Sequence, residues 1–389
     1  MNTDLLKADF LKIANEHMGE GGLFVYERSK LTAAAKSLLK IDMPYGMTVR
    51  YAAKANGHAE IISLFDALGL SFDASSVNEA LRLIDYGVKP GKISLSSQIL
   101  RPTKELERIL SLGVLPVATS LQQIDVLAGL GSKHIAIRVN PGIGSGHNNR
   151  TNVGGPASSF GIWHEDLAKT RGAAKANGQI IDRLHTHIGS GADPGIWRSV
   201  IQKSLEIVGQ LPDVKILDIG GGYKIARMPD EESTDMKAVC DIFAEELKAF
   251  DANTGREIKL EIEPGTYLTA MAGTLLGRVE EMTETDKYKF LKLNVGMNAL
   301  LRPSLYGAQH PIEVLNDSKE TNDYVVVGPC CESGDILTPI PGDPEGILPR
   351  KLNKARIGGI VAIGGVGAYG KTMAASSYND IPEATEAVV

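Results

Sequence analysis

The sequence predicts an α/β fold: a TIM-like (β/α)8 barrel followed by a C-terminal antiparallel β domain. Eight apolar, β-branched segments alternate with amphipathic segments over the first two-thirds of the 389 residues. This pattern is typical of parallel strands joined by crossover helices. Polar residues also gather at the C-terminal end of nearly every predicted strand, where a barrel carries its active site. An open, doubly wound sheet is the alternative, and the number of strands favours the barrel.

The predicted strands and helices follow one another in a regular order. Segments such as "HAEIISLFDALG" and "TKELERILSLG" place apolar residues at helical spacing and end in glycine, a common helix stop. They separate the predicted strands, which are Met47–Lys54, Leu70–Ser75, Lys92–Ser97, Val114–Ser120, His134–Asn140, Ile181–Ser190, Val214–Gly222 and Ile258–Gly265.

The rhythm changes after Tyr267. Stretches such as "DYVVVGPCCESGDIL" read as short strands and turns without long helices between them, which predicts an antiparallel β domain. The early "GGLFVYE" segment precedes the barrel and is expected to join this domain. We therefore predict an N-terminal segment of the β domain at residues 1–34, the barrel at 35–270 and the β domain proper at 271–389.

Composition limits the function classes. Hydrophobic residues make up 43% of the chain and the formal net charge is −6, without a basic cluster, which argues against nucleic acid or an anionic membrane as a partner. The N-terminus lacks the pattern of a signal peptide, and the longest weakly polar run is too short and glycine-rich to span a bilayer. Three cysteines, two of them adjacent, do not suggest a disulfide framework. A cytoplasmic location is expected.

A Walker A pattern, G-x-x-x-x-G-K-[ST], occurs in "GVGAYGKT", residues Gly365 to Thr372. A phosphate-binding loop of that kind lies between a strand and a helix of a larger nucleotide-binding sheet. Here the short remainder of the chain contains Pro382 and leaves no room for further strands. We interpret the motif as a glycine-rich turn that precedes a lysine, not as an ATP site.

Four polar groups are expected at the rim of the barrel. Lys54 ends the first strand, where a desolvated lysine can form a Schiff base. "HTHIGSG" brings His187 and Ser190 to the end of the sixth strand, and Glu263 ends the eighth. The consecutive glycines Gly220–Gly222 allow backbone N–H groups to approach a phosphate closely. A lysine, a phosphate loop, a histidine and a carboxylate are what pyridoxal phosphate requires. Zinc is the weaker alternative, because no cysteine or third histidine lies nearby at ligand spacing, and we predict no metal.

Ten short motifs occur in order along the chain and together carry a resemblance. The sequence from about Leu23 to Asn379 resembles the fold-type III pyridoxal-phosphate decarboxylases of the ornithine, diaminopimelate and arginine decarboxylase family, and most closely the diaminopimelate decarboxylase group. The resemblance implies a homodimer with shared active sites that removes the α-carboxylate of a diamino acid. The motifs are "YAAKAN", "FDASS", "RVNPG", "SSFGI", "HTHIGSG", "DIGGGY", "EPGTY", "RPSLYGAQH", "GPCCESGD" and "GAYGKTMAASSYN".

The resemblance also implies roles for the residues that bind the cofactor. Lys54 matches the lysine that holds pyridoxal 5′-phosphate covalently, His187 the residue stacked on its ring, and Glu263 the carboxylate paired with the pyridine nitrogen. The other positions match phosphate contacts, so "GVGAYGKT" is expected to meet the phosphate of pyridoxal through its tyrosine. These positions are Ser190, Gly220, Gly221, Gly222 and Tyr369.

Substrate contacts follow from the same comparison. Arg302 and Tyr306 match contacts to a substrate carboxylate. Cys331 and Glu332 match a pair that reaches across the dimer interface into the partner's site. Cys331 is a candidate proton donor to the carbanion left after CO2 departs, and Lys54 is the other candidate. The resemblance thus names Lys54, Cys331 and His187 as catalytic.

One departure from the family pattern concerns the substrate. Close relatives carry arginine after "EPG", whereas this chain has Thr266. The loop between Gly142 and Pro156 is rich in glycine and asparagine and is expected to line the substrate entry. The alternatives to free diaminopimelate are D-ornithine, D-lysine and siderophore precursors such as citryl-ornithine or citryl-diaminopropionate. The first of two further hypotheses is an amino-acid racemase, but "GPCCESGD" and the terminal "GAY" favour decarboxylation. The second is a non-catalytic pyridoxal-phosphate-binding protein, and the long β domain argues against it.

Overall fold

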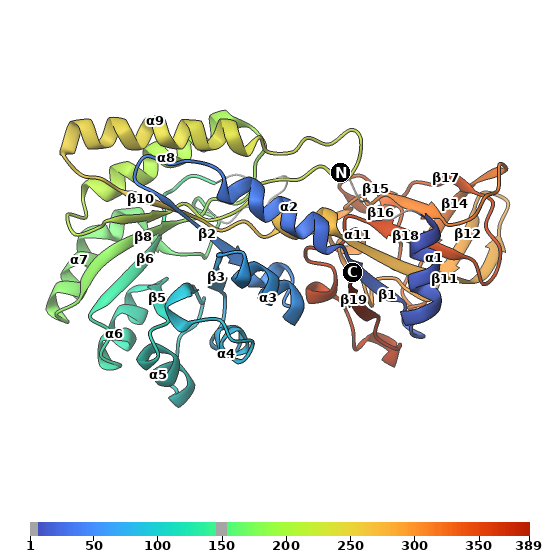
Figure 1. The fold of residues 1–389 in the computed structure, drawn as a ribbon, viewed down its shortest axis with the longest axis horizontal. Helices are drawn as coiled ribbons and strands as arrows, with labels where there is room; N and C mark the ends of the chain where they lie inside the picture. Colours follow the sequence, from blue (N-terminus) through green and yellow to red (C-terminus); the bar gives the residue numbers. More distant parts are fainter. Residues whose placement is uncertain (1–6, 145–153) are drawn as a thin grey trace. The chain divides into compact units, whose positions relative to one another are not determined.

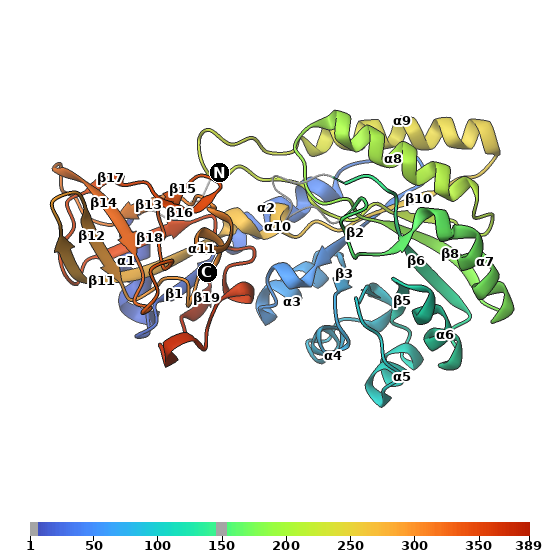
Figure 2. The same ribbon diagram turned by 180° about the vertical axis from the view of Figure 1, so that it is seen from behind.

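The computed structural model describes residues 7–144 and 154–389, and Figures 1 and 2 show its ribbon from opposite sides. The chain forms two compact units. The barrel unit comprises Ala34–Lys224 and Glu232–Tyr267, and the β unit comprises the chain as far as Ala33 together with Ile225–Glu231 and Leu268–Val389. The segment Ile225–Glu231, which the sequence prediction placed in the barrel, therefore groups with the β unit.

The barrel unit contains a closed parallel sheet. In the described part of the chain, each strand pairs in parallel with its neighbours, and β5 pairs with β6 to close the ring. A short strand, β7 (Ile162–Trp163), adds to β6 outside the ring. The predicted (β/α)8 barrel is thus confirmed. Around the ring the strands are β2 (Met47–Ala52), β3 (Ser71–Ala74), β4 (Ile93–Leu95), β5 (Leu115–Ala118), β6 (His134–Asn140), β8 (Ile180–Thr186), β9 (Ile216–Asp218) and β10 (Lys259–Ile262).

Helices alternate with these strands, and their ends follow local chemistry. The side chain of Ser76 accepts a hydrogen bond from the N–H of Glu79 and caps the start of α4, as short polar side chains commonly do. At its C-terminal end, helix α9 stops at Gly255, whose φ of 67° is in the left-handed region that favours glycine. The helices are α2 (Arg28–Leu39), α3 (Ala59–Ala67), α4 (Val77–Asp85), α5 (Lys104–Ser111), α6 (Leu121–Gly129), α7 (Leu167–Ala176), α8 (Pro194–Gly209), α9 (Met236–Thr254) and the short α10 (Thr266–Thr269).

A buried ionic network crosses the inside of the barrel. Arg50 on β2 donates two hydrogen bonds of 2.8 Å to the carboxylate of Glu261 on β10. Arg183 on β8 donates to the same carboxylate at 3.1 Å and to Ser94 Oγ on β4 at 3.0 Å. Removal of one partner from a buried pair of this kind typically costs about 3–5 kcal/mol, because the other charge stays buried and unpaired. The network therefore joins four strands of the barrel.

The β unit is built on one large sheet with the strand order β13-β18-β11-β12-β14-β17. Most of its pairings are antiparallel, as predicted, but β12–β14 and β1–β19 are parallel, because longer connections return the chain in the same direction. A small two-stranded sheet pairs β15 with β16. The remaining elements are β1 (Leu23–Tyr26), β11 (Gly273–Glu284), β12 (Lys289–Leu293), α11 (Arg302–Tyr306), β13 (Ile312–Val314), β14 (Thr321–Val327), β15 (Pro339–Ile340), β16 (Asp343–Ile347), β17 (Arg350–Asn353), β18 (Ile360–Gly364) and β19 (Thr385–Val388).

Both ends of the described chain belong to the β unit. Strand β1, from the "GGLFVYE" segment, lies between β11 and β19. The first helix, α1 (Lys7–His17), packs against this part of the sheet through Phe10, Leu11 and Ala14, whose neighbours include Leu23 and Leu276. Apolar contacts thus hold the N-terminal segment on the sheet. Within the described ranges, no helix is both long and apolar enough to cross a membrane.

Candidate active site

Lys54 lies in a short 3₁₀ turn immediately after strand β2. Its ammonium nitrogen is 3.5 Å from Oδ2 of Asp73, at the C-terminal end of β3. The side chain of Asp73 is 1% exposed, whereas that of Lys54 is 43% exposed. A buried carboxylate therefore orients a lysine whose tip solvent and small molecules can reach.

The two rim loops that follow β8 and β9 meet, and glycine is required where they touch. The N–H of Gly221 donates to Nδ1 of His187 at 3.2 Å. A Cβ on Gly220 would lie 2.5 Å from the same nitrogen, and Gly222 has a φ of +101° with its missing Cβ position 1.7 Å from the oxygen of Gly189. Any side chain at these positions would push the loops apart. Ser190 is half-buried in the first of these loops.

His187 is held as a neutral ring. Burial lowers its pKa well below the ordinary histidine value, and the charges of Arg138 and Lys54 lower it further. Because Nδ1 accepts a hydrogen bond from a backbone N–H, this nitrogen carries no proton. A neutral, oriented imidazole is suited to packing against an aromatic ring.

Buried acids and a histidine gather at the ends of β8, β9 and β10. Nε2 of His185 lies 3.6 Å from Oε2 of Glu263. Burial, together with the charges of Asp218 and Asp73, raises the pKa of Glu263 well above its ordinary value. Burial and the charge of Glu261 raise the pKa of Asp218 to about 6. A positive charge placed beside Glu263 would therefore stabilise its ionised carboxylate.

Buried polar atoms without hydrogen-bond partners indicate which ligand this group of side chains could bind. Among the described residues, Glu263 Oε1, Asp73 Oδ1 and His185 Nε2 are buried without a hydrogen-bond partner. A protonated pyridine nitrogen would supply Glu263 with both a donor and a cation, so the residues fit pyridoxal phosphate. Donor atoms of His185, Asp218 and Glu263 also lie within 4.8 Å of one another and could hold a metal ion. The absence of a metal therefore stays a prediction.

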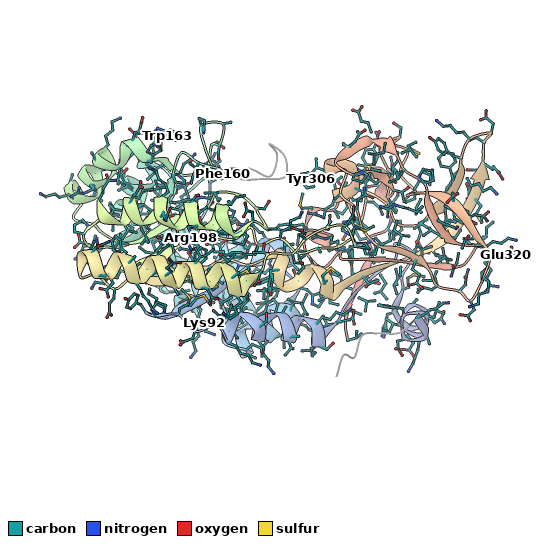
Figure 3. The ribbon with its side chains drawn as sticks, turned by 90° about the horizontal axis from the view of Figure 1, so that it is seen from above. Lys92, Phe160, Trp163, Arg198, Tyr306 and Glu320 are labelled. Atoms are coloured by element: carbon teal, nitrogen blue, oxygen red, sulfur yellow. The ribbon has the colours of Figure 1, made fainter. Side chains whose placement is uncertain are left out.

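Sequence reasoning missed several members of this group. Arg138, on β6, is buried, and its guanidinium lies 5.2 Å from the ring centroid of Phe160, which Figure 3 labels. Its charge acts on Glu263, Asp73 and Asp218. The signal was present, because Asp73 and Arg138 stand in "FDASS" and "RVNPG", two of the ten motifs, each at the end of a strand.

The β unit contains three of the predicted residues, Arg302, Tyr306 and Tyr369. Arg302 begins α11, and its guanidinium lies 5.8 Å from the ring centroid of Tyr306. Burial lowers the pKa of Arg302, and the charges of Tyr306 and Tyr369 oppose this shift. Tyr369 has a φ of 57°, an uncommon conformation for a residue with a side chain. Such strain is found most often at functional sites.

Cys331 and Glu332 are exposed in the loop between β14 and β15. The N–H of Cys331 donates to Oδ1 of Asn379 at 2.8 Å, and the buried carboxylate of Asp335 accepts the N–H of Cys330 at 2.8 Å. Burial and Asp335 raise the pKa of Cys330 to about 12. Of the two adjacent cysteines, Cys331 is therefore the one presented at the surface.

Three remaining predictions concern single segments. After β18, residues Lys371–Met373 form only a 3₁₀ turn where a nucleotide-binding loop needs a helix, and Lys371 Nζ pairs with Glu383 at 2.5 Å. This agrees with our interpretation of "GVGAYGKT", although the remainder of the chain does contain a further strand, β19, contrary to the sequence prediction. Thr266 begins α10 and is half-buried. Most of the loop between Gly142 and Pro156 lies outside the described residues.

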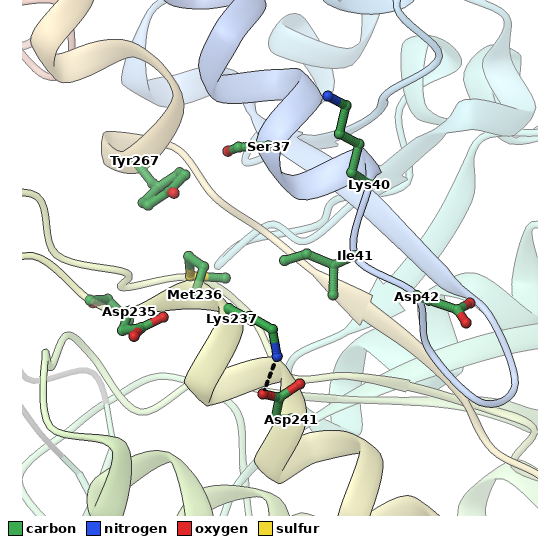
Figure 4. A pocket seen from close by; sticks show the side chains of 10 residues that line it. Ser37, Lys40, Ile41, Asp42, Asp235, Met236, Lys237, Asp241 and Tyr267 are labelled. Carbon is green, nitrogen blue, oxygen red and sulfur yellow. Dashed lines mark hydrogen bonds and ion pairs between the residues drawn. The ribbon is translucent and has the colours of Figure 1, made fainter.

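A cavity of about 580 Å³ lies elsewhere in the barrel unit. Figure 4 shows its lining, in which Lys237 and Asp241 form an ion pair of 2.5 Å. Tyr267, the neighbour of Thr266, also lines it. Within the described ranges none of the predicted site residues lines it, so this cavity is separate from the candidate active site.

Comparison with known proteins identifies the family. A model described as "Pyridoxal-dependent decarboxylase, pyridoxal binding domain" matches residues 28–270, more than half of the chain. The chain belongs to the pyridoxal-dependent decarboxylases. It is 31% identical over 380 residues to the diaminopimelate decarboxylase of Streptomyces coelicolor, with 94% of this chain and 84% of that protein covered.

Solved structures agree with this assignment. A diaminopimelate decarboxylase structure has a TM-score of 0.91 at 28% identity, covering 100% of this chain and 93% of that chain. Another, from Helicobacter pylori in complex with L-lysine, has a TM-score of 0.86 at 27% identity, covering 98% and 94%. The resemblance drawn from the motifs is confirmed. This pyridoxal-dependent decarboxylase is thus an amino-acid decarboxylase, and the racemase and non-catalytic hypotheses are set aside.

Proposed function

We propose that this pyridoxal-dependent decarboxylase removes the α-carboxylate of a diamino acid or its derivative, with pyridoxal 5′-phosphate bound to Lys54. The observation that carries the proposal is the buried oxygen Oε1 of Glu263, which lacks a hydrogen-bond partner, at the barrel rim on which Lys54 also stands. Similarity to diaminopimelate decarboxylases along nearly the whole chain supports the substrate class.

The cofactor, when bound, supplies an electron sink for the bond that releases CO2. Asp73 holds the amine of Lys54 in place. The carboxylate of Glu263 would stabilise a proton on the ring nitrogen, and His187, neutral and fixed by Gly221, would pack on the ring. The N–H groups of Gly220–Gly222, with Ser190 and Tyr369, would hold the phosphate. Cys331 and Lys54 are the candidate donors of the proton that replaces the departing carboxylate.

We also propose a homodimer in which Cys331 and Glu332 serve the partner's site. Their exposure in a single chain supports this, because a residue that acts on a neighbour must lie at the surface. Besides the cofactor, the proposed small-molecule partner is an amino-acid substrate, and we propose neither a nucleic acid nor a membrane as a partner. The free cysteines fit a reducing cytoplasm.

A complementation experiment tests the shared site. Inactive Lys54→Ala chains mixed with inactive Cys331→Ala chains should regain up to about a quarter of the wild-type rate, because random pairing makes half the dimers mixed and each mixed dimer holds one intact site. CO2 release is measured after subunit exchange, which a size-tagged chain verifies. If exchange occurs and no activity returns, each chain contains a complete site and the proposal is wrong.

Thr266 is proposed to reduce the preference for free diaminopimelate. Arginine binds a carboxylate through two parallel hydrogen bonds, and threonine cannot replace that fork. Such a contact contributes on the order of 2–3 kcal/mol. The substrates to compare are meso-diaminopimelate, D-lysine, D-ornithine and citryl-ornithine.

The measurement is kcat/KM for CO2 release from each substrate, in the wild type and in Thr266→Arg. We expect the wild type to favour meso-diaminopimelate over the best alternative by less than about a hundredfold, roughly 2.7 kcal/mol. The arginine variant should raise that ratio about tenfold or more. A wild-type preference above a hundredfold would show that the threonine has not changed specificity. If all four substrates failed to release CO2, the proposed substrate class would be wrong.

A further inference from the structure

Residues 328–335, which follow β14 in the β unit, form a loop that we call the cysteine loop. Two side chains hold consecutive N–H groups of this loop. Oδ2 of Asp335 accepts the N–H of Cys330 at 2.8 Å. Oδ1 of Asn379, which is 48 positions further along the sequence, accepts the N–H of Cys331 at 2.8 Å. The backbone that presents the exposed cysteine is therefore held by a residue of the loop itself and by a residue near the end of the chain.

Asp335 forms the base of the cysteine loop. Its side chain is buried, and its Oδ1 also accepts the N–H of Met297 at 2.6 Å. Only glycine fits beside this carboxylate, because a Cβ on Gly296 or Gly328 would lie 2.2 or 2.3 Å from one of its oxygens. A buried carboxylate that accepts two backbone N–H groups in so tight a site has little freedom to move. The N–H of Cys330 is thus fixed from inside the β unit.

The segment that carries Asn379 is bound to the same frame. The N–H of Ala375 donates to the carbonyl oxygen of Met297 at 3.2 Å, and Met297 in turn donates to Asp335. Asn379 and Asp380 are exposed and have φ values of 57° and 51°, in the left-handed region that residues with a side chain seldom adopt. The chain therefore takes an unfavourable conformation where the amide of Asn379 reaches the cysteine loop.

Two requirements together account for asparagine at position 379. Asparagine and aspartate adopt the left-handed region more readily than other residues with a side chain. Both also have a side-chain oxygen that can accept a hydrogen bond from an N–H group. The turn by itself needs only the first property, which glycine would supply at lower conformational cost. The second property points to the N–H of Cys331.

We propose that Asn379 is a positioning residue, which holds Cys331 and Glu332 through the N–H of Cys331 in the direction in which they serve the partner's site. The inference rests on the proposed shared site of the homodimer. It gives Asn379 no contact with substrate or cofactor. Its effect on the rate must therefore follow the chain that supplies the cysteine loop, not the chain that supplies Lys54.

Amide hydrogen exchange tests the contact in the holoenzyme without an activity measurement. The chain contains three cysteines, so protein labelled with ¹⁵N only at cysteine gives three backbone amide signals, and Cys331→Ser identifies one of them. In Asn379→Gly, exchange of the Cys331 amide should accelerate about tenfold, the order expected for one hydrogen bond. The amides of Cys330 and Cys240 should exchange as in the wild type. Unchanged exchange at Cys331 would overturn the proposal.

Matched variants separate the hydrogen bond from the turn. Asn379→Gly should lower kcat/KM for CO2 release about tenfold or more, because small displacements of a reacting group are costly. Asn379→Asp keeps the oxygen and the backbone conformation and should retain at least about half of the wild-type rate. Asp380→Gly is the control, since it makes the same change at the neighbouring left-handed residue and leaves the amide of Asn379 in place. It should change neither rate nor exchange. An equal loss of rate in Asp380→Gly would assign the effect to the turn and contradict the proposal.

Mixed dimers show which site Asn379 serves. An Asn379→Gly chain diluted into excess Lys54→Ala chains pairs with an intact cysteine loop, and should show the wild-type rate per functional lysine. A wild-type chain diluted into an excess of the double variant, Lys54→Ala with Asn379→Gly, pairs with the altered loop and should show the reduced rate. A reduced rate in the first mixture, or a full rate in the second, would overturn the proposal.

The shared site and the role of Asn379 can fail separately. If Lys54→Ala and Cys331→Ala chains complement each other but Asn379→Gly alters neither the Cys331 amide nor the rate, the role of Asn379 is wrong and the shared site stands. If those chains do not complement each other but the amide and the rate both respond, the shared site is wrong. Asn379 then positions Cys331 for the site of its own chain.

Discussion

Replacement of Lys54 by alanine is expected to abolish the covalent cofactor adduct and to reduce decarboxylation by at least about four orders of magnitude, the scale seen when a covalent catalyst is removed. Lys54 stands at the end of a barrel strand, and its amine is 3.5 Å from the buried carboxylate of Asp73. Alanine would leave the fold of the rim unchanged, because the Lys54 side chain is 43% exposed and fills no core position.

The measurement is borohydride reduction followed by peptide mass spectrometry. The wild type should carry the reduced cofactor on the peptide that contains Lys54, and the variant should carry none. Lys92→Ala is a suitable control, because Lys92, labelled in Figure 3, also pairs with an aspartate, Asp66, at 2.6 Å. It should retain both adduct and activity. A reducible adduct that persists in Lys54→Ala would place the cofactor on another lysine.

Much of the barrel could be predicted from periodicity because each strand is a short apolar run. Strand β6 has the predicted bounds, His134–Asn140. The predicted sixth and seventh strands were too long at their C-terminal ends, since β8 ends at Thr186 and β9 at Asp218. The extra residues carry the glycine-rich loops, whose positive φ values take the chain out of the sheet and onto the rim.

Residues that act through distant partners could not be assigned in this way. Asp73 stands in the motif "FDASS", but its role follows from the short distance to Lys54, which no local sequence pattern reports. Arg227 lies in an irregular stretch without strand or helix periodicity. Its side chain donates to the carbonyl oxygen of Gly365, which is 138 positions away in the sequence. The parallel pairing of β12 with β14 likewise depends on how a long connection returns. Each of these features is set by tertiary contacts.

Replacement of Glu263 by glutamine is expected to lower kcat about 10²–10³-fold, the range for loss of one preorganised electrostatic contact. Glutamine has nearly the shape of glutamate but cannot supply the negative charge that stabilises a protonated ring nitrogen. The matched control is Glu257→Gln, at an exposed position just before β10. It should leave the rate unchanged.

The same Glu263→Gln substitution should stabilise the cofactor-free protein. Burial and the charges of Asp218 and Asp73 raise the pKa of Glu263 above its ordinary value of 4.5. The raised pKa stabilises the folded protein fully below pH 4.5, and this stabilisation is lost as the pH rises through the pKa of the folded state. Glutamine does not titrate. The difference in free energy of unfolding between variant and wild type should therefore be near zero at pH 4.5 and grow with pH to about 1–3 kcal/mol, the scale of one poorly compensated buried group.

Denaturant unfolding of the cofactor-free wild type and variant, from about pH 4.5 upward, measures this difference in stability. Stability and activity together distinguish a structural role of Glu263 from a cofactor-binding role. A residue with a purely structural role would lose stability and activity in parallel. A carboxylate kept buried for the sake of a cationic ligand should lose activity and gain stability, because the fold sustains an unfavourable charge that only the cofactor offsets. If Glu263→Gln destabilised the cofactor-free protein at every pH, Glu263 would already be satisfied by the protein itself. Its assignment to the ring nitrogen would then be wrong.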